Sequence, residues 1–130
     1  MTVRVTVGGL DKLIEAFEKA DRDAVPEAKK VTGRGCLNIK NDWKARWTGL
    51  KALPGLPRTI TYDVTAGRDW ILGEVGPDHR RGGQATLAHI PEYGMPQKNT
   101  PAHPGGRPAL DAEEPRYERA VEALGEDLLQ

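Results

Sequence analysis

The chain has 130 residues, no net charge at pH 7 and a pI near 6.8. This length favours one domain with a modest core. A neutral chain also lacks the field of a domain that binds nucleic acid through its net charge. The single cysteine excludes an internal disulfide and a cysteine-rich zinc site. No apolar stretch approaches the roughly 20 residues that span a bilayer and the N-terminus has no signal-peptide core, so we expect a protein made and kept in a cytosol, without membrane contact.

Three elements are predicted in the first part of the chain. Residues 3–7 alternate valine with polar residues, which is typical of a short half-buried strand. Apolar residues at positions 10, 13, 14 and 17 recur as on one face of a helix, and residues 21–24 are expected to separate this helix from the next. The next helix is long, about six turns, with Pro26 in its first turn and Gly49 as its C-terminal cap.

A hairpin is predicted next. Residues 58–65 alternate apolar and polar side chains, and residues 70–76 return as the second strand after a turn. A basic, glycine-rich tip follows at 79–83. Residues 87–93 fit either a third strand beside the hairpin or a short helical piece, and we favour an extended or short helical piece that leads into a long loop.

The last helix is predicted to begin near Pro108, which suits a first helical turn. Its apolar face runs from Leu110 to Leu128. Pro115 interrupts the pattern, so we expect it either to kink this helix or to begin a new one after a single turn.

The stretch between the hairpin and the last helix, residues 87–110, reads LAHIPEYGMPQKNTPAHPGGRPAL and is rich in Pro and Gly. In a compact domain, a long loop without secondary structure of its own is usually functional or disordered. We predict that this loop is a functional arm, anchored at both ends, that holds a neighbouring subunit.

Together these elements predict one α+β domain. A small antiparallel sheet is expected to pack against a long central helix and a C-terminal helix, with an extended Pro/Gly-rich arm. Within the single domain 1–130, residues 1–86 supply the strand, helices and hairpin, residues 87–107 the arm, and residues 108–130 the C-terminal helix.

Charge is divided between the two long helices. The central helix and its exit are mostly basic, and the last helix is mostly acidic. The two helices pair either within one subunit or across subunits, and a head-to-tail ring needs two such complementary patches. Two independently solvated faces are an equal alternative. The basic residues are Lys29, Lys30, Arg34, Lys40, Lys44, Arg46, Lys51 and Arg58, and the acidic ones are Asp111, Glu113, Glu114, Glu118, Glu122, Glu126 and Asp127.

The residue types that carry enzyme chemistry form no recognisable site. His79, His89 and His103 match no zinc-binding spacing and are best explained as isolated loop histidines. The chain has no serine to act as a nucleophile, and its glycine pairs form no phosphate-binding loop. Cys36 lies in the apolar phase of a helix, where a buried free thiol is expected. We predict no catalytic residue, no cofactor and no metal.

Two aromatic residues and two arginines are candidates for contacts. Trp43 and Trp47 are one helical turn apart, and we expect them to pack over Tyr62 and Trp70 of the hairpin, or one of them to anchor a subunit interface. The pair Arg80-Arg81 is a candidate for phosphate contact, but with so few basic residues in the tip a flexible loop or a contact to an acidic partner is the better explanation.

Four segments, in order along the chain, resemble segments of one family. They are VGGLDKL at 7–13, WTGL at 47–50 followed by RTI at 58–60, HIPEYG at 89–94, and RPAL at 107–110. The family is that of the small morphogenesis proteins of long-tailed bacteriophages, called minor tail, neck or tail-completion proteins. The resemblance covers nearly the whole chain, with two departures: residues 87–88 are Leu-Ala where the family usually has Tyr nearby, and the loop between 94 and 107 is longer and richer in Pro and Gly.

This resemblance implies an α+β subunit without enzyme activity that forms a homo-oligomeric, hexameric ring at the head–tail junction. The implied partners are the head-closure (stopper), tail-terminator and tail-tube proteins, with passive contact to DNA in the lumen. We therefore expect a structural protein of the virion neck or upper tail that joins the tail to the head-closure complex. A tail terminator that caps the tail tube is the nearest alternative. A small nucleic-acid-associated binding module, for example of the toxin–antitoxin type, is the alternative from another class.

The residues that we expect at interfaces come from the central helix, the basic tip and the arm. They are Trp43, Trp47, Arg80, Arg81, Glu92, Tyr93, Pro101, Pro104 and Arg107.

Overall fold

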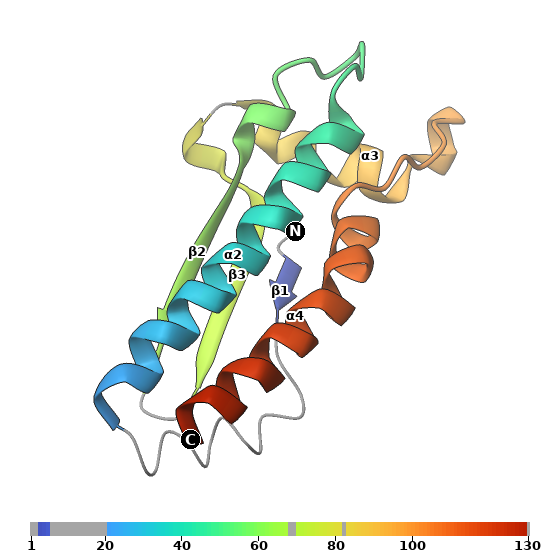
Figure 1. The fold of residues 1–130 in the computed structure, drawn as a ribbon. Helices are drawn as coiled ribbons and strands as arrows, with labels where there is room; N and C mark the ends of the chain where they lie inside the picture. The colour runs from blue at the N-terminus through green and yellow to red at the C-terminus, as the bar shows by residue number, and fades with distance from the viewer. Residues whose placement is uncertain (1–2, 6–20, 68–69, 82, 130) are drawn as a thin grey trace.

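The computed structural model describes residues 3–5, 21–67, 70–81 and 83–129 (Figure 1). An antiparallel sheet is covered on one face by two long helices, α2 (Asp21–Trp47) and α4 (Gly106–Leu129). The arm leaves this body near the N-terminal end of α4, at the upper right of Figure 1. The predicted α+β class, with two long helices on a small antiparallel sheet, is confirmed.

The sheet has three strands in the order β1–β3–β2, all antiparallel. The strands are β1 (Val3–Val5), β2 (Ile60–Ala66) and β3 (Ile71–Pro77). Alternation of apolar and polar residues predicted the β2–β3 hairpin, and its register pairs Ile60 with Pro77 and Ala66 with Ile71. The central strand is therefore β3, and β2 is an edge strand among the described residues.

Helix α2 begins earlier than the sequence predicted. A break was expected at residues 21–24, but the helix already begins at Asp21 and contains Pro26. The prediction was wrong because a proline near the start of a helix removes only one backbone bond. The C-terminal end agrees with the prediction, because α2 ends at Trp47 and Gly49 follows with a φ of 94°. The helix predicted around residues 10–17 lies outside the described residues.

Helix α4 continues through Pro115, so the new helix that was one expected outcome does not form. Pro115 is exposed, while Tyr117 and Val121 beyond it are buried in the core. Burial on both sides of the proline holds the helix together despite the lost backbone bond. Between β3 and α4, residues 89–93 form the short helix α3 (His89–Tyr93), which confirms the short helical alternative over a third hairpin strand.

The core lies between the helices and the sheet. Its largest fully buried side chains come from α2, the connector and the hairpin: Trp43, Trp47, Ile39, Leu56, Ile60 and Val75. The rings of Trp43 and Trp47 meet edge to face, with centroids 5.4 Å apart and planes at 75°. In the described part of the chain, no helix is both long and apolar enough to cross a membrane.

Candidate functional site

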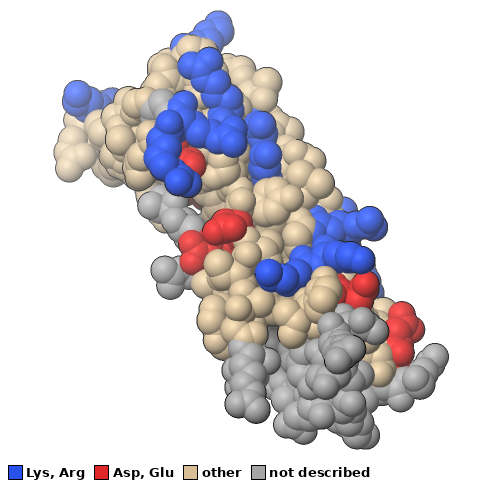
Figure 2. All heavy atoms as spheres, turned by 90° about the vertical axis from the view of Figure 1, so that its left-hand side faces the viewer, with Lys and Arg blue, Asp and Glu red and all other residues tan. Residues whose placement is uncertain are grey.

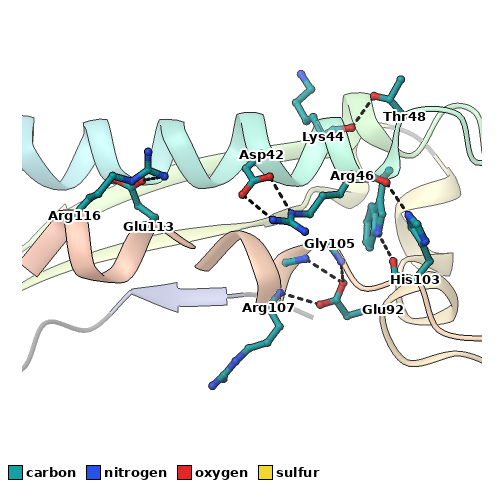
Figure 3. A network of polar contacts seen from close by, with 12 residues as sticks. Asp42, Lys44, Arg46, Thr48, Glu92, His103, Gly105, Arg107, Glu113 and Arg116 are labelled. Atoms are coloured by element: carbon teal, nitrogen blue, oxygen red, sulfur yellow. Dashed lines mark hydrogen bonds and ion pairs between the residues drawn. The ribbon is translucent and has the colours of Figure 1, made fainter. Parts of the chain in front are cut away.

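The buried carboxylate of Glu92 holds the N-terminus of α4 (Figure 3). The backbone N–H groups of Gly105 and Gly106 donate to its Oε2 at 2.8 and 3.1 Å, and that of Arg107 donates to its Oε1 at 3.0 Å. These donors have no partner inside the helix, and an acidic group suits the positive end of the helix dipole. Bonds to an ionised acceptor are also the stronger kind. Glu92 therefore ties α3 to α4 at the base of the arm.

His103 fixes the returning end of the arm to two other elements. Its backbone N–H donates to the carbonyl of Pro91 at 2.6 Å, and its carbonyl accepts the indole N–H of Trp47 at 2.9 Å. Its ring nitrogen Nε2 lies 3.0 Å from the carbonyl oxygen of Arg46. Because a carbonyl oxygen only accepts, Nε2 is the protonated ring nitrogen in this contact. Figure 3 shows His103 between the end of α2 and the arm.

The chain crosses the tryptophan pair directly before α4. A Cβ added to Gly105 would lie 2.6 Å from Cδ1 of Trp43, and one added to Gly106 would lie 2.7 Å from the same ring. Only glycine allows so close an approach. Trp43 and Trp47 thus pack directly against residues 105–106, where the arm ends and α4 begins. We call these residues the base of the arm. Tyr62 and Trp70, which were expected against them, are instead 38% and 50% exposed.

The arm between its two anchors is short and turned back on itself. Met95 and Thr100 bond through their backbones in both directions, at 2.9 and 3.1 Å. Between them lie a 3₁₀ turn, Pro96–Lys98, and Asn99 in the left-handed region with a φ of 51°. The side chains from residue 96 to residue 104 are exposed, including the predicted contact residues Pro101 and Pro104.

Tyr93 is the most exposed large apolar side chain among the described residues, at 70%. It lies between buried Glu92 and Gly94, whose φ of 76° ends α3. A Cβ on Gly94 would lie 2.9 Å from backbone atoms of the returning arm, so this turn also requires glycine. The phenol ring of Tyr93 is therefore held outward beside the arm by a fixed backbone.

The predicted basic tip forms a short 3₁₀ turn, His79–Arg81. Arg80 pairs with Asp78 through two side-chain bonds of 3.1 Å each, and these bonds lower the pKa of the Asp78 carboxyl. Arg81 is exposed. On this side of the molecule, Lys and Arg gather over the upper part of the surface, with fewer Asp and Glu between them (Figure 2).

A groove of about 440 Å³ lies between α2 and α4. Its floor holds Glu113, which is 4% exposed, accepts a bond from Asn38 at 3.0 Å and pairs with Arg116 at 2.8 Å. The hydroxyls of Thr32 and Tyr117 bond nearby. Burial is the main cause that raises the pKa of the Tyr117 phenol. These contacts join the two helices within one chain.

The groups that were weighed for chemistry are the three histidines and Cys36. No cluster of three His, Cys, Asp or Glu side chains in the described ranges could hold a metal ion. Cys36 is buried, and burial raises the pKa of its thiol to about 11, so the thiol is protonated at neutral pH.

Sequence analysis predicted that the arm is anchored at both ends, but it did not predict which contacts anchor it. Glu92 and Arg107 were expected at an interface, and the structure joins them to each other through the Arg107 backbone. Trp43 and Trp47 are fully buried under the arm's base. Nothing in the sequence pointed to His103 as an anchor, whereas the pair Gly105-Gly106 before a helix was a usable sign of close packing.

Comparisons with protein families, with curated proteins and with solved structures found no match to this chain. Candidate functional features must therefore come from the structure of the chain itself. They are a doubly anchored arm with Tyr93 at its base, and a surface on which Lys and Arg gather.

Proposed function

We propose that the chain is a structural, non-enzymatic subunit of a phage virion, part of a neck or tail-completion ring that joins the tail to the head-closure complex. The observation that carries this proposal is the arm. Glu92 and His103 fix its two ends, while the side chains from residue 96 to residue 104 are exposed. Such an arm contributes little to the core of its own subunit and is well placed to contact a neighbour.

The arm is suited to docking because little of its freedom remains to be lost. Prolines at 96, 101 and 104 restrict its backbone, and the Met95–Thr100 bonds close its tip. A preorganised segment binds more tightly because less conformational entropy is lost on binding. Tyr93 adds a large exposed ring at the arm's base, and aromatic residues of this kind are enriched among interface anchors.

The structure also gives a physical reason for two of the segments behind the family resemblance. The segments at 89–94 and 107–110 meet through Glu92, whose carboxylate accepts the Arg107 N–H. Gly94 is needed at its position by a positive φ and by the close approach of the arm. The resemblance and the geometry thus support the same arm as the functional element.

In this proposal the subunit acts in the neck or upper tail of the virion after synthesis in the host cytoplasm. It forms a ring, expected to be a hexamer, between the head-closure and tail-tube proteins, with a tail-terminator role as the nearest alternative. The lumen of such a ring passes DNA without specific recognition.

A nucleic-acid-binding module is the second candidate, and the gathering of Lys and Arg in Figure 2 favours it. Binding to phosphates weakens steeply as salt rises, because each contact releases counterions. Assembly through an arm with apolar contacts would change far less. A titration with duplex DNA at rising salt separates the two candidates.

The test of the proposed function is the native mass of the protein, alone and mixed with the tail-tube protein of the same phage. We expect a discrete ring, alone or with that partner. Tyr93→Ala and replacement of residues 96–99 by two glycines should each weaken assembly and spare folding. Trp70→Ala, which removes an exposed aromatic ring far from the arm in sequence, is the matched control. Unchanged assembly in both arm variants would count against the proposal.

A further inference from the structure

One flank of α2 carries a row of lysines beside the hairpin. Lys29, Lys40 and Lys44 are 11 and 4 residues apart, a spacing that places them on the same side of a helix. The amine of Lys40 lies 5.8 Å from the centre of the Tyr62 ring, so this side borders β2. We call these three lysines the basic flank. Figure 2 looks at this side of the molecule.

A row of carboxylates lies on α4. Glu114, Glu118 and Glu122 are each four residues apart and all exposed, so they form one line along the helix. The residues of α4 that line its groove with α2 are Glu113, Arg116, Tyr117 and Ala120. The row of three therefore lies on the side of α4 turned away from α2. We call it the acidic flank.

The two flanks do not neutralise each other within one chain. Helices α2 and α4 meet through Thr32 with Tyr117 and Asn38 with Glu113. No residue of either flank takes part in these contacts, and Lys40 lies instead against Tyr62 of β2. The charges of the basic and acidic flanks consequently point in different directions. Other charges of the two helices do face each other, because Lys30 and Arg34 of α2 line the groove with Glu113 of α4; the two flanks lie outside that groove.

Two residues of each flank share the same spacing, and apolar side chains lie beside the basic flank. Lys40 and Lys44 lie about 6 Å apart along their helix, as do Glu118 and Glu122 along theirs, at a rise of 1.5 Å per residue. Two exposed apolar side chains lie beside the basic flank, Leu37 at 40% and Tyr62 at 38%. Apolar groups surrounded by charges are typical of protein interfaces.

We infer that copies of this chain associate head to tail, with the basic flank of one copy on the acidic flank of the next. Because the two surfaces differ, the contact is heterologous, and such contacts close into rings or grow into filaments. The inference rests on the proposed function only in so far as both require contact between copies. It names the surfaces that would form the ring.

Charge reversal of each flank tests the inference. In Lys40→Glu/Lys44→Glu the flank on α2 carries two acidic residues beside Lys29 and becomes net acidic. In Glu118→Lys/Glu122→Lys the flank on α4 carries two basic residues beside Glu114 and becomes net basic. Each variant alone should associate at least about tenfold more weakly than the wild type, because attraction becomes repulsion. An equimolar mixture of the two should recover association, since each acidic flank then finds a basic one. Sedimentation at 50 mM salt, over a range of concentrations, measures this without a virion or a tail protein.

The control is Lys51→Glu/Arg58→Glu, which makes the same change of net charge as Lys40→Glu/Lys44→Glu, at exposed positions outside both flanks and outside the arm. It should associate like the wild type, and circular dichroism should show every variant folded. Wild-type association in both reversal variants would overturn the inference while leaving the proposed ring intact. Loss of association in both without recovery in the mixture would also overturn it, as would a wild type that stays monomeric at millimolar concentration.

Discussion

The indole N–H of Trp47 donates a hydrogen bond of 2.9 Å to the backbone carbonyl of His103. This bond joins the last residue of α2 to the returning end of the arm, across 56 positions of sequence. The neighbouring Trp43 has a buried indole N–H with no hydrogen-bond partner among the described residues. The two tryptophans pack in the same place, but only Trp47 makes a hydrogen bond through its indole N–H. They are therefore a well-matched pair for mutagenesis.

Replacing Trp47 by Phe should cost more stability than replacing Trp43 by Phe. Both changes leave a similar void, but only the first leaves the His103 carbonyl without its donor. The difference should be about 1 kcal/mol, the net worth of one such bond. Urea denaturation followed by far-UV circular dichroism measures both free energies of unfolding. Equal losses would show that the bond adds nothing to stability.

Removing the carboxylate of Glu92 should destabilise the fold through the start of α4. Glu92→Ala leaves three N–H donors without an acceptor, and we expect a loss of about 2–3 kcal/mol. Glu92→Gln keeps one acceptor oxygen and should lose about half as much. The exposed Glu114→Gln is the control and should stay within about 0.5 kcal/mol of the wild type. Thermal and urea unfolding should both show the largest loss of stability for Glu92→Ala, a smaller loss for Glu92→Gln and almost none for the control.

Alanine at Gly105 or Gly106 should be destabilising by about 1–3 kcal/mol. The added methyl group would overlap the ring of Trp43, which is packed on all sides and cannot withdraw. Gly33 is the matched control, because nothing lies within 4 Å of its added Cβ and it is in the middle of α2. Gly33→Ala should therefore stabilise the protein by up to about 1 kcal/mol. The same direction of change at all three glycines would contradict this packing.

Cys36 should make stability fall as the pH rises above the ordinary thiol range. Its pKa in the folded protein is raised to about 11 by burial, from an ordinary value of 9.0. The folded state thus keeps a proton that the unfolded state releases, so the contribution is complete below pH 9 and is lost as the pH approaches 11. Tyr117, whose pKa is also raised, acts in the same direction at the upper end of this window. The loss of stability from pH 8 to pH 10.5 should be smaller in Cys36→Ala than in the wild type.

A thiol reagent gives an independent check on Cys36. At pH 8 the native protein should react slowly, and the unfolded protein in urea should react at the rate of a free thiol. Fast reaction of the native protein would show that the thiol is more accessible than its 1% exposure indicates.

The sequence predicted those parts of the fold whose signals are local. Alternation in β2 and β3 predicted the hairpin, and the apolar period of α2 placed Ile39, Trp43 and Trp47 in the core. Period alone, however, says which face of a helix is buried and not what covers it. For that reason the tryptophans were assigned to Tyr62 and Trp70, when the chain that covers them is the Gly105–Gly106 segment.

Prolines misled the prediction for a related reason. Pro26 and Pro115 carry a local penalty that sequence rules read as a helix boundary. In the structure both lie within continuous helices, because buried residues such as Ala28 and Tyr117 hold the helix on the far side of each proline. A local cost was outweighed by packing that is visible only in three dimensions.

The anchors of the arm could be predicted only in part. Glu92 and Arg107 were named, but their contact closes a loop of irregular backbone whose path has no periodic signal. The contacts of His103 involve its backbone as much as its ring, and backbone contacts leave no mark on residue type. Tyr93 was named as an interface residue and is exposed in the subunit, although residue type alone does not decide this, since tyrosine is common both in cores and on surfaces.

The order of the strands has a consequence for how the chain is synthesised. Val3 of β1 pairs with Val75 of β3, 72 positions later, whereas β2 ends at Ala66 and β3 begins at Ile71. At translation rates of about 5–20 residues per second, β1 leaves the ribosome roughly 4–15 s before its partner. Throughout that interval β1 has no partner, because β3 is the strand with which it pairs in the described sheet. The three-stranded sheet can therefore be completed only after β3 has been synthesised.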